Sequence, residues 1–137
     1  MILYFVNPAW IKFLIIPFPQ FVSWLGVFGG IFGIALLTWV HIHLGKQWSA
    51  DLQLNPDHQL IESGPYSRIR HPMYTALITV YLALGIVSSN YIISTVFIMI
   101  IFSVVIRIPD EEKMMMGKFG ERYKIYMQKT GRLLPKF

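Results

Sequence analysis

Three long apolar runs, each without a charged side chain, dominate the pattern of hydrophobic and polar positions along this chain. They extend from Phe21 to Leu44, from Pro72 to Ser88 and from Tyr91 to Ile106. A helix that crosses a bilayer needs about 20 predominantly apolar residues, so the first run is long enough and the second is near the short end of the usual range. The polar turn at 88–90 makes the last two runs a helical hairpin. The pattern predicts three transmembrane helices.

The N-terminal segment, residues 1–20, is apolar and aromatic but interrupted. The interruptions are at Asn7-Pro8, Lys12, Pro17 and Pro19. The segment is either a short or broken spanning helix or a hairpin-like piece at the interface, and the pattern leaves both open. We expect a hydrophobic anchor without a catalytic role, because no two of its polar groups have a useful spacing.

The polar tail, residues 107–137, predicts one more helix. Pro109 suits a first helical turn, and the three acids that follow it are favourable near the positive end of the helix dipole. Methionine and aromatic residues recur as far as Tyr126. We therefore expect an amphipathic helix that lies against the membrane or over the preceding polar loop and ends at Gly131.

Composition supports a membrane protein. Of the 137 residues, 55% are hydrophobic and only 14% are charged, which is too apolar for a water-soluble domain of this size. The fold class that we expect is an all-α integral membrane protein with one domain, residues 1–137. Cysteine is absent, which excludes disulfides and thiolate chemistry. The N-terminus has neither the basic region nor the small-residue cleavage site of a removable signal peptide.

The charged residues predict the orientation in the membrane. The net charge is +5, and eleven of the twelve basic residues lie from Lys46 onward. The hairpin places residues 45–71 and 107–137 on the same face, and the positive-inside rule puts that face in the cytoplasm. This distribution is that of a multi-pass membrane protein in contact with lipids, and we expect no nucleic-acid partner.

Two polar clusters flank the hairpin, at 66–74 and at 107–112. The open ends of a hairpin are neighbours, so the clusters form one candidate site at the membrane surface. It could take a water-soluble cofactor from one side and a lipid-like substrate from the other. The alternative is that these residues are topology signals and snorkelling anchors. We expect no metal site at His41 and His43, which are two residues apart and face different directions on a helix.

The residues around this site resemble a known family. The resemblance rests on Leu60-Ile-Glu-Ser-Gly-Pro-Tyr-Ser-Arg-Ile-Arg-His-Pro-Met-Tyr74, Glu111-Glu112, Phe119-Gly-Glu-Arg-Tyr123, Tyr126 and Arg132-Leu-Leu-Pro135. From about Gln47 onward the chain is similar to the isoprenylcysteine carboxyl methyltransferases and the related phospholipid methyltransferases. Relatives often carry more spanning helices upstream, so a partner subunit could complete the substrate wall here.

The resemblance implies a methyltransferase that binds S-adenosylmethionine in a pocket made by the loop, the hairpin ends and the C-terminal helix. It implies that Arg107 contacts the substrate near its carboxylate. The positions that it assigns to the cofactor are His58, Gln59, Leu60, Ile61, Tyr66, His71, Pro72, Met73, Tyr74 and Glu111.

The methyl acceptor stays open between three lipophilic classes. A prenylcysteine carboxylate is already ionised at neutral pH and needs no base. A phospholipid amine must lose a proton, which Glu112 or a nearby tyrosine would accept. A thiol is the third class. The rival functions are a sterol-type reductase that binds a nicotinamide cofactor and a membrane scaffold without activity.

The oligomeric state is also open. Gly26, Gly29, Gly30 and Gly33 place small residues at near-helical spacing, which allows another helix to approach closely. Packing through these glycines is compatible with a monomer or a homodimer.

Overall fold

The computed structural model describes residues 12–45 and 59–136, and the regular elements in these ranges are helical. In chain order they are α2 (Gln20–Leu44), the 3-10 turn η3 (Gly64–Ser67), α3 (Pro72–Ser88), α4 (Tyr91–Ile106), α5 (Ile108–Phe119) and α6 (Glu121–Lys129). For the described residues, the prediction of an all-α fold is confirmed.

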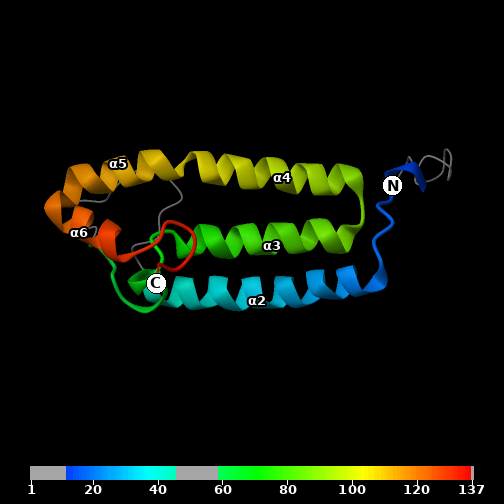
Figure 1. Cartoon of the computed structure of the whole chain (residues 1–137), viewed down its shortest axis with the longest axis horizontal. Helices are drawn as coiled ribbons and strands as arrows, with labels where there is room; N and C mark the ends of the chain where they lie inside the picture. The colour runs from blue at the N-terminus through cyan, green and yellow to red at the C-terminus, as the bar shows by residue number, and fades with distance from the viewer. Residues whose placement is uncertain (1–11, 46–58, 137) are drawn as a thin grey trace.

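The long helices form a layer in which α3 lies between α2 and α4 (Figure 1). Small residues set the α2–α3 spacing, since Gly26 and Gly33 are buried on α2 and a Cβ on either would meet valine side chains of α3. On the other side of α3, the Ser94 hydroxyl donates a hydrogen bond to the Gly85 carbonyl at 2.9 Å, which joins α4 to α3. The glycines that were predicted to allow close approach of another helix therefore lie against α3 of the same chain.

Two of the three predicted spans have both the length and the composition to cross a membrane. They are α2, with 25 residues, and the helical stretch Tyr91–Phe119, in which α5 follows α4 directly after Arg107. The third, α3, is an apolar helix of 17 residues, so its axis is about 26 Å long at 1.5 Å per residue. Its bounds and those of α4 match the predicted runs, and α2 begins one residue earlier than predicted.

The polar tail folds as two helices, where the sequence predicted one. The break is at Gly120, whose φ of +51° is favourable for glycine and costly for other residues. After the break, α6 turns back over the polar loop (Figure 1). There Tyr123 and Tyr126 pack with Leu60 in a small buried core. The tail covers the loop with an amphipathic helix, α6, as predicted. It does so only because the chain reverses direction at Gly120, which was not predicted.

The N-terminal segment contacts the closed end of the hairpin. The Ile16 N–H donates to the Ser89 carbonyl at 2.8 Å, and Ile15 forms an isolated bridge with Asn90. In the described part of the segment, residues 12–19, the only helix is a short turn at 12–14. That part does not span the bilayer, and residues 1–11 lie outside the described residues.

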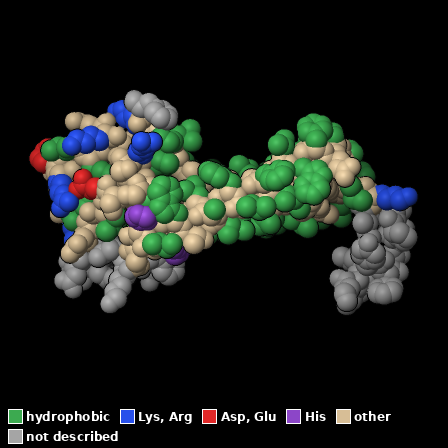
Figure 2. Space-filling view, turned by 90° about the horizontal axis from the view of Figure 1, so that it is seen from below, with side chains coloured by type: hydrophobic (Ala, Val, Ile, Leu, Met, Phe, Trp, Pro, Cys, Tyr) green, Lys and Arg blue, Asp and Glu red, His purple; other side chains and the backbone are tan. Residues whose placement is uncertain are grey.

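The surface divides into an apolar rod and a charged end. Figure 2 shows hydrophobic side chains along the rod and basic and acidic side chains gathered at the end that carries α5 and α6. The large exposed hydrophobic residues lie mainly on α2 and α4. The hairpin thus delivers its two open ends to the charged end of the molecule.

We predict that Gly33→Ala weakens the packing of α2 on α3. The new Cβ would lie 2.7 Å from the Val80 Cγ2 and 3.1 Å from the Val80 backbone nitrogen, which cannot move without α3. Overpacking of this kind costs about 1–3 kcal/mol. Thermal unfolding in detergent, followed by circular dichroism, should show a lower midpoint.

The matched control is Gly117→Ala on α5, where a Cβ would meet nothing within 4 Å. Replacing an exposed helical glycine with alanine stabilises a helix by about 0.5–1 kcal/mol, so this midpoint should rise or stay unchanged. Equal midpoints for the two variants would show that Gly33 does not set the α2–α3 contact.

Candidate active site

A glycine turn delivers the polar loop to the start of α3. Gly64 has a φ of +58°, and a Cβ at this position would overlap the imidazole of His43 at the end of α2. The His43 Nδ1 lies 3.0 Å from the Trp39 carbonyl, so the ring is held against the turn. Pro72 then occupies the first turn of α3, where its missing N–H costs nothing. This places His71 at the N-cap of α3.

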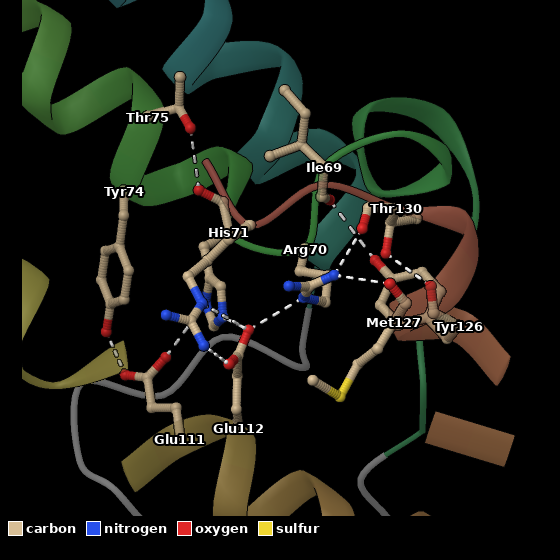
Figure 3. Close-up of polar contacts among 11 residues, drawn as sticks. Ile69, Arg70, His71, Tyr74, Thr75, Glu111, Glu112, Tyr126, Met127 and Thr130 are labelled. Atoms are coloured by element: carbon tan, nitrogen blue, oxygen red, sulfur yellow. Dashed lines mark hydrogen bonds and ion pairs between the residues drawn. The ribbon is translucent and has the colours of Figure 1, made fainter. Parts of the chain in front are cut away.

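A buried carboxylate joins the loop, α5 and the chain end. Glu112 is 6% exposed, and its Oε1 accepts hydrogen bonds from the Arg70 Nε at 2.9 Å and the Arg132 Nε at 3.2 Å. Its Oε2 accepts from the Arg132 Nη2 at 2.5 Å. The Arg70 Nη1 also donates to the carbonyls of Met127 and Thr130 (Figure 3). Three segments distant in sequence are therefore fixed to one another.

The protonation of Glu112 follows from these contacts. Burial alone would raise its pKa, but the hydrogen bonds and charges of Arg132 and Arg70 outweigh burial and lower the pKa below its ordinary value. The same contact with Glu112 raises the pKa of Arg132. Glu112 is therefore an ionised anchor at neutral pH.

A second cluster surrounds the neighbouring carboxylate, Glu111. Its Oε1 accepts a hydrogen bond from the Tyr74 hydroxyl, and its Oε2 lies 3.6 Å from the His71 Nδ1. The rings of His71 and Tyr74 are stacked, with centroids 5.6 Å apart. The other ring nitrogen of His71 lies 3.4 Å from the Glu112 Oε1, so His71 lies between the two acids (Figure 3). A quarter of the Glu111 side chain remains exposed.

Tyr66 and Arg107 border this cluster. Burial and the negative charge of Glu111 raise the pKa of Tyr66, so its hydroxyl is neutral. The charge of Arg107, at the junction of α4 and α5, acts on the Tyr74 hydroxyl. The two ends of the hairpin therefore meet as the sequence predicted, with Tyr74 from one end and Glu111 from the other.

The remaining residues that the resemblance assigned to the cofactor differ in burial. Leu60 is in the core with the α6 tyrosines, and Pro72 is fully buried in the first turn of α3. Gln59 is exposed, and Ile61 and Met73 are partly buried. His58 lies outside the described residues. In the described ranges, no group of three His, Asp or Glu residues is arranged to hold a metal ion.

Three residues that the sequence did not single out as site residues support Glu112 and the turn of Tyr66. Arg70 and Arg132 bind Glu112, while the Tyr126 hydroxyl donates to the Tyr66 carbonyl at 2.7 Å and so fixes the turn that carries Tyr66. Arg132 and Tyr126 belong to the motif that carried the family resemblance. Nothing in their spacing indicated which residues they would contact.

We predict that Glu112→Gln destabilises the protein at neutral pH and that the difference from the wild type disappears in acid. Breaking a buried ion pair costs about 3–5 kcal/mol, because the charge of the 10%-exposed Arg70 loses its anionic partner. The folded pKa of Glu112 is lowered, so its stabilisation is complete above the ordinary value of 4.5 and is lost as the pH falls below it. Unfolding midpoints of both proteins between pH 7 and pH 3 should converge at the acid end.

The matched control is Glu62→Gln, which removes the exposed pair that Glu62 forms with Arg122. An exposed pair contributes at most about 1 kcal/mol, so this midpoint should change little at any pH. A Glu112→Gln protein as stable as this control at pH 7 would contradict the anchoring role.

Comparisons with known proteins identify a family and a shared fold. The family model of the isoprenylcysteine carboxyl methyltransferase (ICMT) family matches residues 24–117. The match begins upstream of the predicted resemblance, within α2, and ends before the break at Gly120. The uncharacterized protein YpbQ of Bacillus subtilis (strain 168) is 27% identical over 92 residues, which cover 64% of this chain and 55% of that protein.

The fold is also found in a solved structure, that of the eukaryotic intramembrane Ras methyltransferase ICMT without a monobody. The TM-score is 0.72 and the identity is 24%, over 85% of this chain and 43% of that one. This chain thus spans about half the length of the relatives that it matches. Since the family model matches more than half of the chain, the protein belongs to the isoprenylcysteine carboxyl methyltransferase family.

Proposed function

We propose that this protein is a membrane methyltransferase that transfers the methyl group of S-adenosylmethionine to a lipophilic acceptor, the carboxylate of an isoprenylcysteine-like substrate. The observation that carries the proposal is the meeting of Tyr74 and His71 with Glu111 at the open end of an apolar hairpin. Family membership and the fold of a Ras methyltransferase support it.

The residues present suit the cofactor. S-adenosylmethionine supplies a methyl group on a positively charged sulfur and carries an ammonium group. Glu111 offers a partly exposed carboxylate, and aromatic rings attract cations at their faces. The rings of His71 and Tyr74 belong to the cluster around Glu111, and the ring of Tyr66 borders it. Glu111 binds and orients the donor in this proposal, and the rings limit the access of water.

The contacts of Glu112 favour one class of acceptor. Its two oxygens accept hydrogen bonds from two guanidinium groups, and its pKa is lowered, so it is a poor base. We therefore assign Glu112 to the framework of the site. A carboxylate needs no base because it is already ionised, whereas a phospholipid amine must lose a proton. These contacts favour the carboxylate, which Arg107 would bind in bidentate fashion.

Methyl transfer to a carboxylate then requires that the two reactants are aligned, without a general base. The donor carbon and the acceptor oxygen must be in line, and water must be excluded. Arg107 follows the apolar helix α4 directly, so a substrate held by this side chain would keep its lipophilic part beside the hairpin. The site thus borders both a polar loop and an apolar surface.

We propose that α2, α3 and α4 all cross the membrane and that the charged end faces the cytoplasm. With three crossings, the loop 45–71 and the tail 107–137 lie on one face. The clustering of charged side chains at one end of the rod supports this arrangement (Figure 2). The basic excess of that end is what the positive-inside rule expects of a cytoplasmic face.

The proposal predicts that the detergent-purified protein binds S-adenosylmethionine and its demethylated product, and that Glu111→Gln loses this binding while it stays folded. The substitution keeps the shape of the side chain and removes its charge. Isothermal titration calorimetry measures the binding of both ligands, with a reduced nicotinamide cofactor titrated in parallel. Binding of the nicotinamide alone would indicate the reductase, and binding of neither cofactor would overturn the methyltransferase.

We predict that Arg107→Ala retains the cofactor affinity of the wild type and loses methyl transfer to a prenylcysteine carboxylate by about 100-fold or more, because a charge-assisted contact to the acceptor is removed. Radiolabelled methyl transfer and calorimetry on the same preparation separate the two effects. Wild-type activity in this variant would remove Arg107 from the substrate site.

A further inference from the structure

The chain end lies alongside the segment that carries His71. The Gly131 N–H donates to the Arg68 carbonyl at 3.0 Å, the Arg70 N–H donates to the Gly131 carbonyl at 2.8 Å, and the His71 N–H donates to the Arg132 carbonyl at 3.0 Å. Ile69 and Gly131 form an isolated parallel bridge. We name residues 130–133 the C-terminal strap.

The strap also holds the first turn of α3. The Thr75 hydroxyl donates to the Leu133 carbonyl at 2.6 Å. At the other end of the strap, the Thr130 carbonyl accepts from the Arg70 side chain. The strap is thus attached to the main chain up to His71 and, after His71, to the side chain of Thr75.

Arg132 connects this main-chain contact to α5. Its Nε and Nη2 reach different oxygens of Glu112, and its own side chain is 52% exposed while that of Glu112 is 7% exposed. Its backbone carbonyl binds the His71 N–H. One residue therefore fixes His71 through its main chain and fixes α5, the helix of Glu111, through its side chain.

We propose that Arg132 is a positioning residue that sets the distance between His71 and Glu111 and thereby prepares the cofactor site. Arg132 acts through Glu112, to which its side chain donates two hydrogen bonds. Arg70 joins the Thr130 carbonyl of the strap to the same carboxylate. The guanidinium fork is required because it contacts both carboxylate oxygens, which a lysine ammonium cannot do in the same geometry. The proposal rests on the proposed function for the identity of the ligand, S-adenosylmethionine.

The test compares Arg132→Met and Arg132→Lys with the wild type in calorimetric titrations with S-adenosylmethionine. We expect the dissociation constant to rise about tenfold in Arg132→Met and by an intermediate factor in Arg132→Lys, because small displacements of binding groups are costly. A structural defect alone would lower the number of binding sites per protein and leave the dissociation constant of the folded fraction unchanged. If Arg132→Met does not fold, Arg132→Lys decides.

A second measurement follows the protein without a ligand. Hydrogen exchange of the Arg70 and His71 amides, which donate to the strap, should be about tenfold faster in Arg132→Met because the local opening is easier. The matched control is Arg122→Met, which removes the exposed ion pair with Glu62 near the same end of the molecule. It should change neither the exchange of these amides nor the dissociation constant.

The outcomes separate the two proposals. Unchanged dissociation constants in both Arg132 variants, with binding intact in the wild type, would overturn the positioning role and leave the proposed function standing. If the wild type does not bind S-adenosylmethionine, the proposed function fails, and with it the role of Arg132 toward that ligand. Accelerated exchange in the Arg132 variant would then support only the attachment of the strap, and unchanged exchange would overturn that as well.

Discussion

The charged end of this molecule depends on one buried carboxylate between two guanidinium groups. Glu112 gives up its hydration on burial, and Arg70 and Arg132 compensate with hydrogen bonds to both of its oxygens. The segments that meet there are a loop, a short helix and a chain end, whose apolar core is small and centred on Leu60, Tyr123 and Tyr126. The ion pairs of Glu112 and the main-chain hydrogen bonds of the C-terminal strap add to this core in arranging the three segments.

The apolar end follows a different constraint. The helix α3 is packed on both sides, by α2 and by α4, whereas α4 has no buried residue of its own in this structure. A helix that exposes so much apolar surface is stable in lipid and would aggregate in water. Close approach through Gly26 and Gly33 gives α2 and α3 the van der Waals contact that membrane helices depend on. The layer therefore supports the hairpin, whose open ends carry the proposed site.

The sequence predicted the elements of the apolar end because their signals are local. Charge-free runs ended at prolines and polar turns, and the runs at 72–88 and 91–106 have the bounds of α3 and α4. The meeting of Tyr74 with Glu111 was also predictable, since a hairpin brings its open ends together whatever its side chains are.

The charged end was less predictable because its contacts are distant in sequence. Arg70 and Glu112 are 42 residues apart, and Arg132 and Glu112 are 20 apart, so no periodicity relates them. Both arginines belonged to the motifs of the family resemblance, and Arg70 to the polar cluster at 66–74, but neither position indicated Glu112 as the partner. The break at Gly120 is made possible by the glycine, which is visible in the sequence. A glycine inside a helical pattern is often tolerated, however, so the sequence alone does not indicate a break. The positive φ of Gly120 in the structure shows that the chain reverses there.

The two adjacent acids of α5 show how one helix can serve both the framework and a ligand. Successive residues on a helix point about 100° apart, so neighbours face different surroundings. Glu112 faces two arginines, whose positive charges compensate its negative charge. Glu111 faces the Tyr74 hydroxyl and His71 and stays partly exposed. The negative charge of Glu111 is therefore directed toward the site, with the positive charge of Arg107 beside Tyr74. A site with this polarity suits a cationic methyl donor and an anionic acceptor at once, which is the combination that the proposed reaction requires.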